Sequence, residues 1–470
     1  MNPAHTMTPI SRRRFLQAAS TMAAAASALW TPSLFADGNP IPGDRPVRDP
    51  RVIVENPQLR VPLSFIIDDS TCLVNLAHFA IPQFAQVYPE NYKQDWKKLP
   101  REIPDSFVRK FSEWCHDRGI KGKYSIVPYP ACVGRVDREL PGWTRAEQEA
   151  SLQLVRDIIL PDWDIHPEMV THTWIIDPKT GHPHAERTPK FMENFRWADG
   201  RSVDEIAEYM AYALKILKNV GLPCEGITTP GGFGNRVLPE LSQATFQAVR
   251  DVHGAEIPHY FRHLFTDDTS VAPRVEYASG LHTENPSCVV SIIGCTGDWF
   301  GGWDGLEPGQ TGQFISMDGK DGRLPEVIKR GEPTILVCHW PGLYYNGEEV
   351  GFNIFKEVVA RLNANYDNLL WMKNSEIARY WAAKELTAIT RGETSVQLQA
   401  PYACPRFTLR VKEITGGPQP KVQLSSEESA PLKRVERALA LVPGTCWWDG
   451  NDLVACLENL PKGAVTLSWG

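Results

Sequence analysis

Strand-like apolar runs alternate with helical patterns along most of this chain, and no other feature restricts its fold as much. Residues 61–67 have the composition of a buried strand, residues 105–118 have helical periodicity that stops at a glycine, and residues 123–128 form a second strand pattern. Strands that alternate with helices are typical of a parallel sheet. We therefore predict an α/β domain over residues 61–390, preceded by an extended lead-in over residues 37–60.

One helix within this domain has a clear start. Ser202 and Glu205 have the spacing of a capping box, in which each side chain bonds the other residue's backbone N–H. Ile206, Met210 and Leu214 then recur at helical spacing, which predicts one buried face. Further strands are predicted at residues 227–229, 334–338 and 369–372.

The pattern changes after residue 390. Residues 395–399, 407–411 and 464–468 alternate between apolar and polar side chains. That period of two is typical of antiparallel strands with one exposed face. We predict that residues 391–470 form a small, all-β, sandwich-like domain.

The chain begins with the composition of an export signal. Residues 11–17 read Ser-Arg-Arg-Arg-Phe-Leu-Gln, and a short alanine-rich apolar stretch follows. Positive charge, then a short apolar segment, then small residues is the order found in secretory signals. The paired arginines resemble the twin-arginine (Tat) signal. We expect residues 1–36 to be this signal, cleavage near Ala36, passage through the Tat export machinery, and a periplasmic or secreted protein.

Charge and hydropathy narrow the classes of partner. The whole chain has a formal net charge of −7, which becomes −10 without residues 1–36 because they hold three arginines and no carboxylates. An acidic chain of this kind argues against a nucleic-acid partner. No second apolar run approaches the length of a membrane span, so we expect none in the mature chain. The ten cysteines show no metal-type spacing, and we assign no disulfide pairing.

Polar residues stand where several predicted strands end. Asp68 and Asp69 follow the first strand, His172 follows another apolar run, Pro230 follows a short strand, and His339 follows a late one. In a parallel α/β fold these ends meet at one face, where active sites are found. Paired carboxylates at the end of a buried run are costly without a purpose. We therefore expect these residues to form a catalytic site.

These positions resemble the motifs of the polysaccharide deacetylase family (carbohydrate esterase family 4). Residues 65–69 read Phe-Ile-Ile-Asp-Asp, like the first motif, and residues 172–174, which follow Glu168, read His-Thr-Trp, like the second. Residues 228–235 read Thr-Thr-Pro-Gly-Gly-Phe-Gly-Asn, similar to the third, and residues 336–340 read Leu-Val-Cys-His-Trp, similar to the last. The motifs occur in the family's order, within about residues 60–385.

The resemblance implies a distorted (β/α) barrel that holds one divalent metal, commonly zinc. It implies that Asp69 and His172 are metal ligands and that Asp68 is the general base for the water that the metal activates. His339 would be the general acid that protonates the leaving group, a role that suits imidazole near neutral pH.

Two positions depart from the family pattern. A second metal-binding histidine is expected four residues after His172, where the chain has Ile176. An arginine that orients the base is expected at residue 228, where the chain has a threonine. The candidates for the missing ligand are His166, His182, His184 and Asp177.

Aromatic residues near the predicted strand ends suggest a carbohydrate substrate, because sugars stack on aromatic rings through their apolar C–H faces. Core packing is the alternative role for these rings. The residues expected to bind substrate are Trp174, Trp299, Trp340, Pro230 and Gly231.

The sequence therefore predicts an exported metal-dependent hydrolase that removes acyl groups, N-acetyl or O-acetyl, from a carbohydrate. One alternative keeps the fold but hydrolyses a non-peptide C–N bond in a small amide. Another is a catalytically silent glycan-binding protein, which the departures at Ile176 and Thr228 favour.

Overall fold

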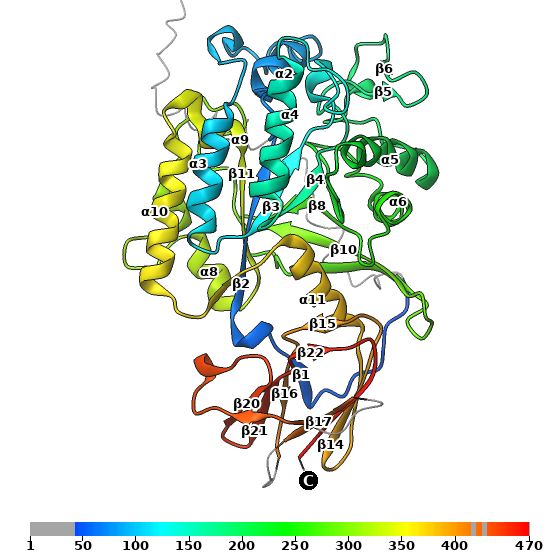
Figure 1. Cartoon of the computed structure of the whole chain (residues 1–470), viewed down its shortest axis with the longest axis vertical. Coiled ribbons are helices and arrows are strands. Elements are labelled where there is room, and N and C mark those ends of the chain that lie inside the picture. The colour runs from blue at the N-terminus through cyan, green and yellow to red at the C-terminus, as the bar shows by residue number, and fades with distance from the viewer. Residues whose placement is uncertain (1–42, 415–419, 425–429, 470) are drawn as a thin grey trace, which may run out of the picture. The chain divides into compact units, whose positions relative to one another are not determined.

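The chain is described here by a computed structural model, which covers residues 43–414, 420–424 and 430–469 (Figure 1). The predicted export signal, residues 1–36, lies outside these ranges. Among the described residues, none of the helices has the length and hydropathy needed to cross a membrane. The description that follows concerns the compact unit formed by residues 43–470.

Parallel strands form the first sheet, as the sequence predicts. The order is β11-β2-β3-β4, with β12 also paired to β2, and all of these pairs are parallel. The strand bounds are β2 (Val61–Asp68), β3 (Gly122–Ile126), β4 (Trp163–Pro167), β11 (Thr334–His339) and β12 (Leu369–Trp371). Every residue of β2 is buried, which agrees with its apolar composition.

A second sheet continues the arrangement in the order β7-β8-β10-β9. Its pairs are parallel except the one between β10 and β9. The bounds are β7 (Gly226–Thr228), β8 (His259–Leu264), β9 (Arg274–Ser279) and β10 (Ser287–Gly294).

The two sheets meet at two seams. At one, a single parallel bridge joins Glu168 to Thr228. At the other, Cys295 N–H donates a hydrogen bond to the carbonyl of Ile335 at 2.8 Å. The prediction of a parallel α/β fold is confirmed, but the pairing among the described residues forms two sheets and no closed barrel.

Helices lie outside the strands (Figure 1). The main ones are α2 (Leu76–Phe84), α3 (Asp105–His116), α4 (Arg145–Leu154), α5 (Val203–Asn219), α6 (Leu238–His253), α8 (Arg323–Arg330), α10 (Val350–Asn365) and α11 (Asn374–Leu386). The capping box predicted for α5 is present, since Ser202 and Glu205 exchange both hydrogen bonds. Ile206, Met210 and Leu214 are all fully buried on its inner face.

The C-terminal part of the chain is antiparallel in most of its pairs. One sheet has the order β1-β16-β21-β20-β19 and another the order β13-β14-β23-β17-β18. The bounds are β1 (Val52–Val54), β13 (Ala388–Arg391), β14 (Ser395–Ala400), β15 (Cys404–Pro405), β16 (Thr408–Val411), β17 (Lys421–Leu424), β18 (Ala430–Pro431), β19 (Lys433–Arg434), β20 (Thr445–Asp449), β21 (Asp452–Cys456), β22 (Asn459–Leu460) and β23 (Gly463–Ser468). Strand β1 of the lead-in pairs antiparallel with β16 and so belongs to a sheet of the C-terminal residues.

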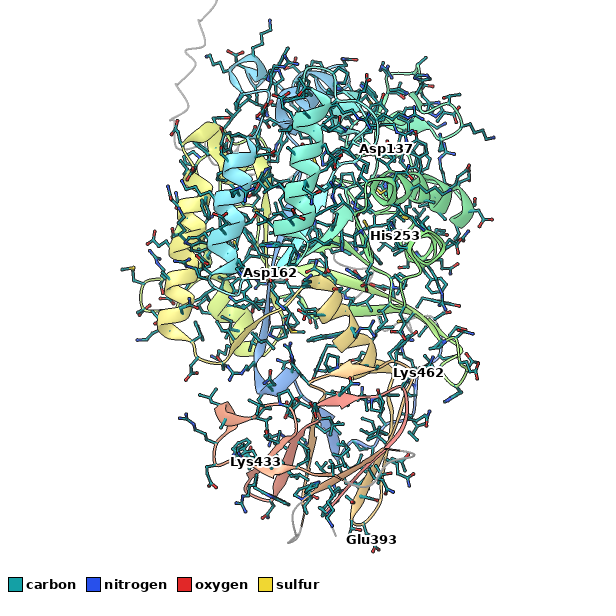
Figure 2. All side chains as sticks on the ribbon, in the orientation of Figure 1. Asp137, Asp162, His253, Glu393, Lys433 and Lys462 are labelled. Atoms are coloured by element: carbon teal, nitrogen blue, oxygen red, sulfur yellow. The ribbon has the colours of Figure 1, made fainter. Side chains whose placement is uncertain are left out.

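The C-terminal strands share a hydrophobic core with the α/β part. Trp381 of α11 and Val290 of β10 belong to the same buried cluster as Leu398 and Phe407. Lys462, labelled in Figure 2, adds a hydrogen bond to the backbone carbonyl of Glu284. This packing covers the amino ends of the parallel strands and leaves their carboxyl ends free for a site.

All ten cysteines lie within the described residues and have free thiols. Burial raises the pKa of Cys72 to about 12 and of Cys295 to about 12. Thiols of this kind stay protonated at neutral pH, so these two cysteines are suited to packing rather than to nucleophilic chemistry.

Candidate active site at the carboxyl ends of the parallel strands

Asp68 and Asp69 stand where β2 ends and the backbone turns sharply. Asp68 is the last residue of β2, and Asp69 has a φ of 58°, in the left-handed region that residues with a Cβ seldom adopt. In this turn the Asp69 N–H donates a hydrogen bond of 2.7 Å to Oε2 of Glu168. A strained residue held by a buried carboxylate is typical of a functional site.

The segment after β4 brings Glu168 and His172 together. Met169 and His172 have positive φ values of 48° and 62°, so the chain coils tightly just after the strand. Nε2 of His172 lies 2.7 Å from Oδ1 of Asp69 and 3.3 Å from Oε1 of Glu168. All three side chains are buried, and their donor atoms lie within 4.8 Å of one another. We call Asp69, Glu168 and His172 the catalytic trio.

Glu193 holds the coiled segment in place from beneath. Its carboxylate accepts hydrogen bonds from the backbone N–H of Thr171 at 2.9 Å and of His172 at 2.5 Å, and from the Tyr209 hydroxyl. Glu193 is fully buried, and burial raises its pKa to about 7, although the donors, Tyr209 first, lower it. Because these bonds fix the backbone of His172, Glu193 acts as a positioning residue.

Asp69 and Glu168 of the catalytic trio are two buried carboxylates, and they need a positive charge close by. Burial disfavours the charged imidazole, but Asp69 and Glu168 outweigh it and raise the pKa of His172 well above its usual value. Burial also raises the pKa of Glu168, but His172 and Lys123 outweigh it and lower that pKa to about 2. A divalent metal ion would supply the same positive charge and displace the proton from His172.

Three possible metal-binding atoms converge in the trio. Oδ1 of Asp69 is buried 2.7 Å from Nε2 of His172, and Oε1 of Glu168 lies 3.3 Å from the same nitrogen. Carboxylate oxygens and an imidazole nitrogen that converge in this way match the ligands preferred by zinc and similar divalent ions. The residues of the trio fit a metal ion.

Lys123 of β3 supplies the cation beside Asp68. Its Nζ bonds Oδ1 of Asp68, Oγ of Ser125 at 2.8 Å and the carbonyl of Ile67 at 3.2 Å, and its side chain is fully buried. Burial raises the pKa of Asp68 to about 6, and Lys123 is the strongest opposing influence. The cation beside Asp68 therefore comes from β3.

His339 meets the same site from β11. It pairs with Asp68 in the strand register, and its Nδ1 lies 2.7 Å from Oδ2 of Asp298. This contact fixes the ring and leaves Nε2 free to face a substrate. Burial lowers the pKa of His339, but Asp69, Asp298 and Asp68 have the larger combined effect and raise this pKa to about 10. His339 therefore carries a proton at neutral pH.

The candidates proposed for the third metal ligand do not join the trio. His182 is exposed and His184 half-buried, in and beside the hairpin of β5 (Ile176–Asp177) and β6 (His182–Pro183). Asp177 instead bonds the turn of that hairpin, accepting from the N–H of Lys179 at 2.9 Å. Asp177 therefore stabilises a surface turn.

His166 is also absent from the trio, because it lies earlier on β4 and faces His259 at 3.0 Å. The third side chain that meets Asp69 and His172 is Glu168, four residues before His172, whereas Ile176, four residues after it, is fully buried.

Two of the three tryptophans expected to bind substrate are core residues. Trp340 is 1% exposed, and its ring packs against Phe107 and Phe111, at centroid distances of 5.0 and 5.2 Å. Trp174 is 4% exposed beneath the guanidinium of Arg187. Trp299 is half-buried against Phe314. Packing therefore accounts for Trp340 and Trp174 without a substrate.

The glycine turn adjoins the trio through Asn194. Pro230 is buried, whereas Gly231 is exposed with a φ of 46°, and a Cβ there would come within 2.7 Å of the Asn194 carbonyl. The Asn194 amide lies 3.4 Å from Nδ1 of His172. The absence of a side chain at Gly231 therefore lets the turn approach Asn194, whose amide contacts His172.

A different group of aromatic rings lies beside His172. The Phe84 ring is 6.5 Å from the His172 ring and 6.0 Å from the Trp303 ring. The group, which we call the aromatic rim, consists of Phe84, Tyr88, Tyr92, Phe195 and Trp303. All but Phe84 are partly exposed. Trp303 is in the aromatic-rich segment before β11, but the other four had no sequence signal.

Four residues of the site were missed by sequence reasoning. They are Lys123, Glu168, Glu193 and Asp298. Glu168 stands close to His172 in the sequence, but the positive φ values of the coiled segment, and not helical spacing, bring the two side chains together. The other three come from elements distant in sequence, and only the fold brings them to the site.

Comparisons with known proteins add little to this geometry. No family model matches the sequence, and no curated protein matches it. A probable polysaccharide deacetylase from Pseudomonas aeruginosa PAO1 is 11% identical over 68% of this chain and 90% of its own, with a TM-score of 0.33. Puue allantoinase is 13% identical over 74% and 95%, with a TM-score of 0.32. A glycoside hydrolase family 30 subfamily 8 xylanase from Clostridium acetobutylicum is 10% identical over 76% and 90%, with a TM-score of 0.25. Scores this low carry no argument, so function is argued from this chain's own residues.

Proposed function

We propose that this protein is a metal-dependent hydrolase that removes acyl groups, N-acetyl or O-acetyl, from a carbohydrate. The observation that carries the proposal is the catalytic trio, in which the buried Oδ1 of Asp69 lies 2.7 Å from Nε2 of His172 and Oε1 of Glu168 lies 3.3 Å from it. Asp69, Glu168 and His172 would hold one divalent ion, zinc or a similar metal. Such an ion, when bound, lowers the pKa of water and polarises an acyl carbonyl.

Asp68 would act as the general base. It lies next to Asp69 and has a carboxylate whose pKa, at about 6, leaves it ionised at neutral pH and able to accept a proton from water. Lys123 and Ser125 hold this carboxylate in one orientation. The proton is taken up by Asp68 as the water oxygen bonds to the acyl carbon.

His339 would act as the general acid on the other side of the acyl group. Asp298 bonds Nδ1, so the proton on Nε2 is directed away from Asp298 and can pass to the leaving nitrogen or oxygen. His339 and Asp68 occupy paired positions on adjacent strands, which places an acid and a base in one site. That arrangement favours hydrolysis over simple binding.

A carbohydrate substrate is supported by the aromatic rim beside the trio. Rings that are partly exposed and partly packed can stack against the apolar face of a sugar without loss of side-chain freedom. The Phe84 ring is in contact distance of both the Trp303 ring and the His172 ring. A sugar held on these rings would therefore present its acyl group to the trio.

The departures at Ile176 and Thr228 favoured a silent glycan-binding protein, but Glu168 would supply the metal ligand and Lys123 the positive charge that those positions lack. A binding protein has no need for this replacement. We therefore keep hydrolysis as the proposed function.

The test is metal content and product release by the full-length protein. We expect acetate release from an acetylated xylo-oligosaccharide or an N-acetylglucosamine oligomer, lost after chelation and restored by zinc. The Asp69→Ala variant should lose both the ion and the activity, and Asp318→Ala, an exposed aspartate, is the control. Ammonia release from small amides without acetate release would instead identify the alternative hydrolase. Glycan binding with no hydrolysis of either substrate would contradict the proposal.

We also propose that the chain leaves the cytoplasm through the Tat machinery, on the basis of the paired arginines in residues 12–13. The double variant Arg12→Lys and Arg13→Lys keeps the charge and should retain the protein in the cytoplasm. Cell fractionation measures this, with Arg45→Lys as the control. Export of the double variant at the level of the unmodified protein would contradict the proposed Tat route.

A further inference from the structure

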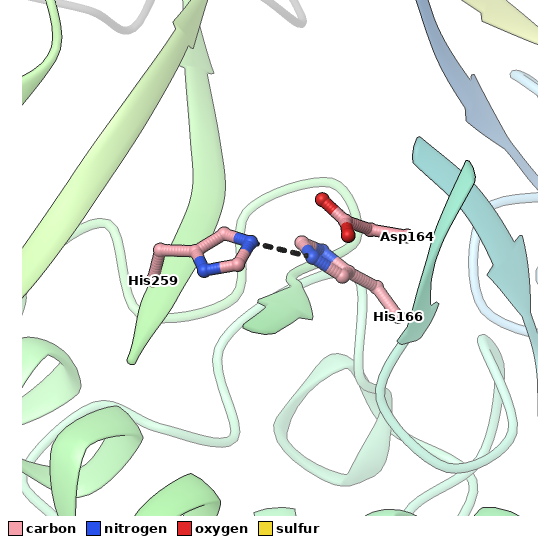
Figure 3. Close-up of side chains that lie close together, drawn as sticks. All are labelled: Asp164, His166 and His259. Atoms are coloured by element: carbon pink, nitrogen blue, oxygen red, sulfur yellow. Dashed lines mark hydrogen bonds between the residues drawn. The ribbon is translucent and has the colours of Figure 1, made fainter. Parts of the chain in front are cut away.

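A second group of metal-type side chains lies on strands of both parallel sheets, further from the carboxyl ends of the strands. Asp164 and His166 are two residues apart on β4, so their side chains share one face of the strand. His259 is the first residue of β8, and the three side chains lie close together (Figure 3). Each offers one donor atom, and these atoms lie within 4.8 Å of one another. We call these residues the deep cluster. It is separate from the catalytic trio, which lies at the end of β4.

The two imidazoles of the deep cluster meet through the same atom. Nε2 of His166 lies 3.0 Å from Nε2 of His259 (Figure 3). Both side chains are fully buried. In tetrahedral coordination two such nitrogens stand about 3.3 Å apart, so a small outward shift would accommodate a zinc ion.

The imidazoles can each offer a lone pair to a metal ion. Both rings are fully buried and face each other through Nε2, and a neutral imidazole has one nitrogen lone pair. A hydrogen bond between the rings uses one lone pair and one N–H, whereas a metal ion uses a lone pair from each.

Asp164 supplies an oxygen that is already oriented. Its two carboxylate oxygens accept hydrogen bonds from Ser375, one from the backbone N–H at 2.6 Å and one from the hydroxyl at 2.8 Å. Ligating carboxylates in metal sites are commonly hydrogen-bonded in this way, and each oxygen keeps a further lone pair. Asp164 is only partly buried, so an ion could enter from its side.

The neighbouring strand leaves room for the two rings. A Cβ on Gly226 of β7 would come within 2.5 Å of Nε2 of His166 and 2.7 Å of Cδ2 of His259. Any other residue there would displace the imidazole pair. Two residues further along β7, Oγ1 of Thr228 lies 3.4 Å from Nδ1 of His166.

We propose that Asp164, His166 and His259 bind a second divalent ion, of the zinc class, in a structural site that joins β4 to β8. The two strands belong to different sheets, and the backbone pairing that the described residues show at this seam is the bridge between Glu168 and Thr228, with a hydrogen bond of 3.2 Å from the Met169 N–H to the Thr228 carbonyl. An ion held by both strands would strengthen the seam directly beneath Glu168. A water molecule would complete four-coordination.

The test counts ions in the full-length protein after removal of metal and titration with Zn²⁺ or Co²⁺. We expect two ions per chain in the wild type, one in Asp69→Ala, one in His259→Gln and none in the double variant. His253→Gln, a half-buried histidine of α6 labelled in Figure 2, should keep two. Zn²⁺ should also raise the melting temperature of Asp69→Ala, in which only the deep cluster remains.

The outcomes separate this inference from the proposed function. One ion in the wild type that Asp69→Ala loses and His259→Gln keeps would overturn the second site while leaving the catalytic one. One ion that only His259→Gln loses would support the deep cluster and remove the catalytic metal. If His259→Gln fails to fold, Asp69→Ala decides alone, because an absence of bound ion and of any change in melting temperature there would overturn the inference.

Discussion

Lys123 and Asp68 form a buried ion pair between neighbouring strands, directly beside the catalytic trio. Buried pairs of this kind cost desolvation energy and are retained for specificity or function more than for stability. Here the pair keeps the proposed general base ionised in an interior where burial alone would protonate it.

Replacing Lys123 should therefore move the acidic limb of the pH–rate profile. Lys123 lowers the pKa of Asp68, so Lys123→Met should raise it, by about 1 to 2 units. The base must be ionised to work, and activity should then appear only at correspondingly higher pH. The measurement is kcat against pH from 5 to 9. Lys121→Met, which removes a partly exposed lysine paired with Glu376, should leave the limb in place; an unchanged limb in Lys123→Met would refute the role.

Glu168 should be needed for metal binding. Glu168→Gln can still accept the hydrogen bond from Asp69 N–H, but it loses the negative charge that faces His172. We expect metal affinity to fall by more than about 100-fold, since changes to outer-shell partners alone cost about 10- to 100-fold. Glu168→His, which offers a neutral imidazole nitrogen as a metal ligand, should recover part of the affinity. Titration with a competing chelator measures this, and wild-type affinity in Glu168→Gln would exclude Glu168 as a ligand.

Asp298 should set the protonation of His339. Burial lowers the pKa of His339, and Asp298 is among the carboxylates that raise it to about 10, so Asp298→Asn should lower it. His339 would then lose its proton at lower pH. The basic limb of the kcat profile should therefore move to lower pH, and kcat should fall by about 10²-fold. Asp304→Asn, in the same loop but bonded to Gln94, is the control. A basic limb that does not move would separate Asp298 from the acid.

Glu193 should affect both stability and metal affinity. Glu193→Gln replaces one acceptor oxygen with an NH₂ group that faces backbone N–H donors, at a cost of about 1–3 kcal/mol in the free energy of unfolding. Because the same bonds fix His172, the metal affinity of the catalytic trio should fall as well. Tyr209→Phe removes only one donor to Glu193 and should have a smaller effect on affinity. Urea unfolding and metal titration measure the two quantities, and equal affinities in both variants would contradict the positioning role.

The sequence by itself determined the α/β class and part of the site. Strand composition and helical periodicity are local properties, so β2, β11 and the capped helix α5 could be predicted from them. Asp68, Asp69 and His339 were also accessible, because strand ends in a parallel fold meet at one face. Residue type and position along the chain carry that information.

Only the tertiary structure decided which residues complete the site. The positive φ values of Asp69 and His172 bring Glu168 into the trio, and no periodicity records them. Lys123 reaches Asp68 from another strand, and His259 meets His166 across the seam between sheets. These contacts depend on strand order and register, which are set by packing over the whole chain and not by the residues nearby.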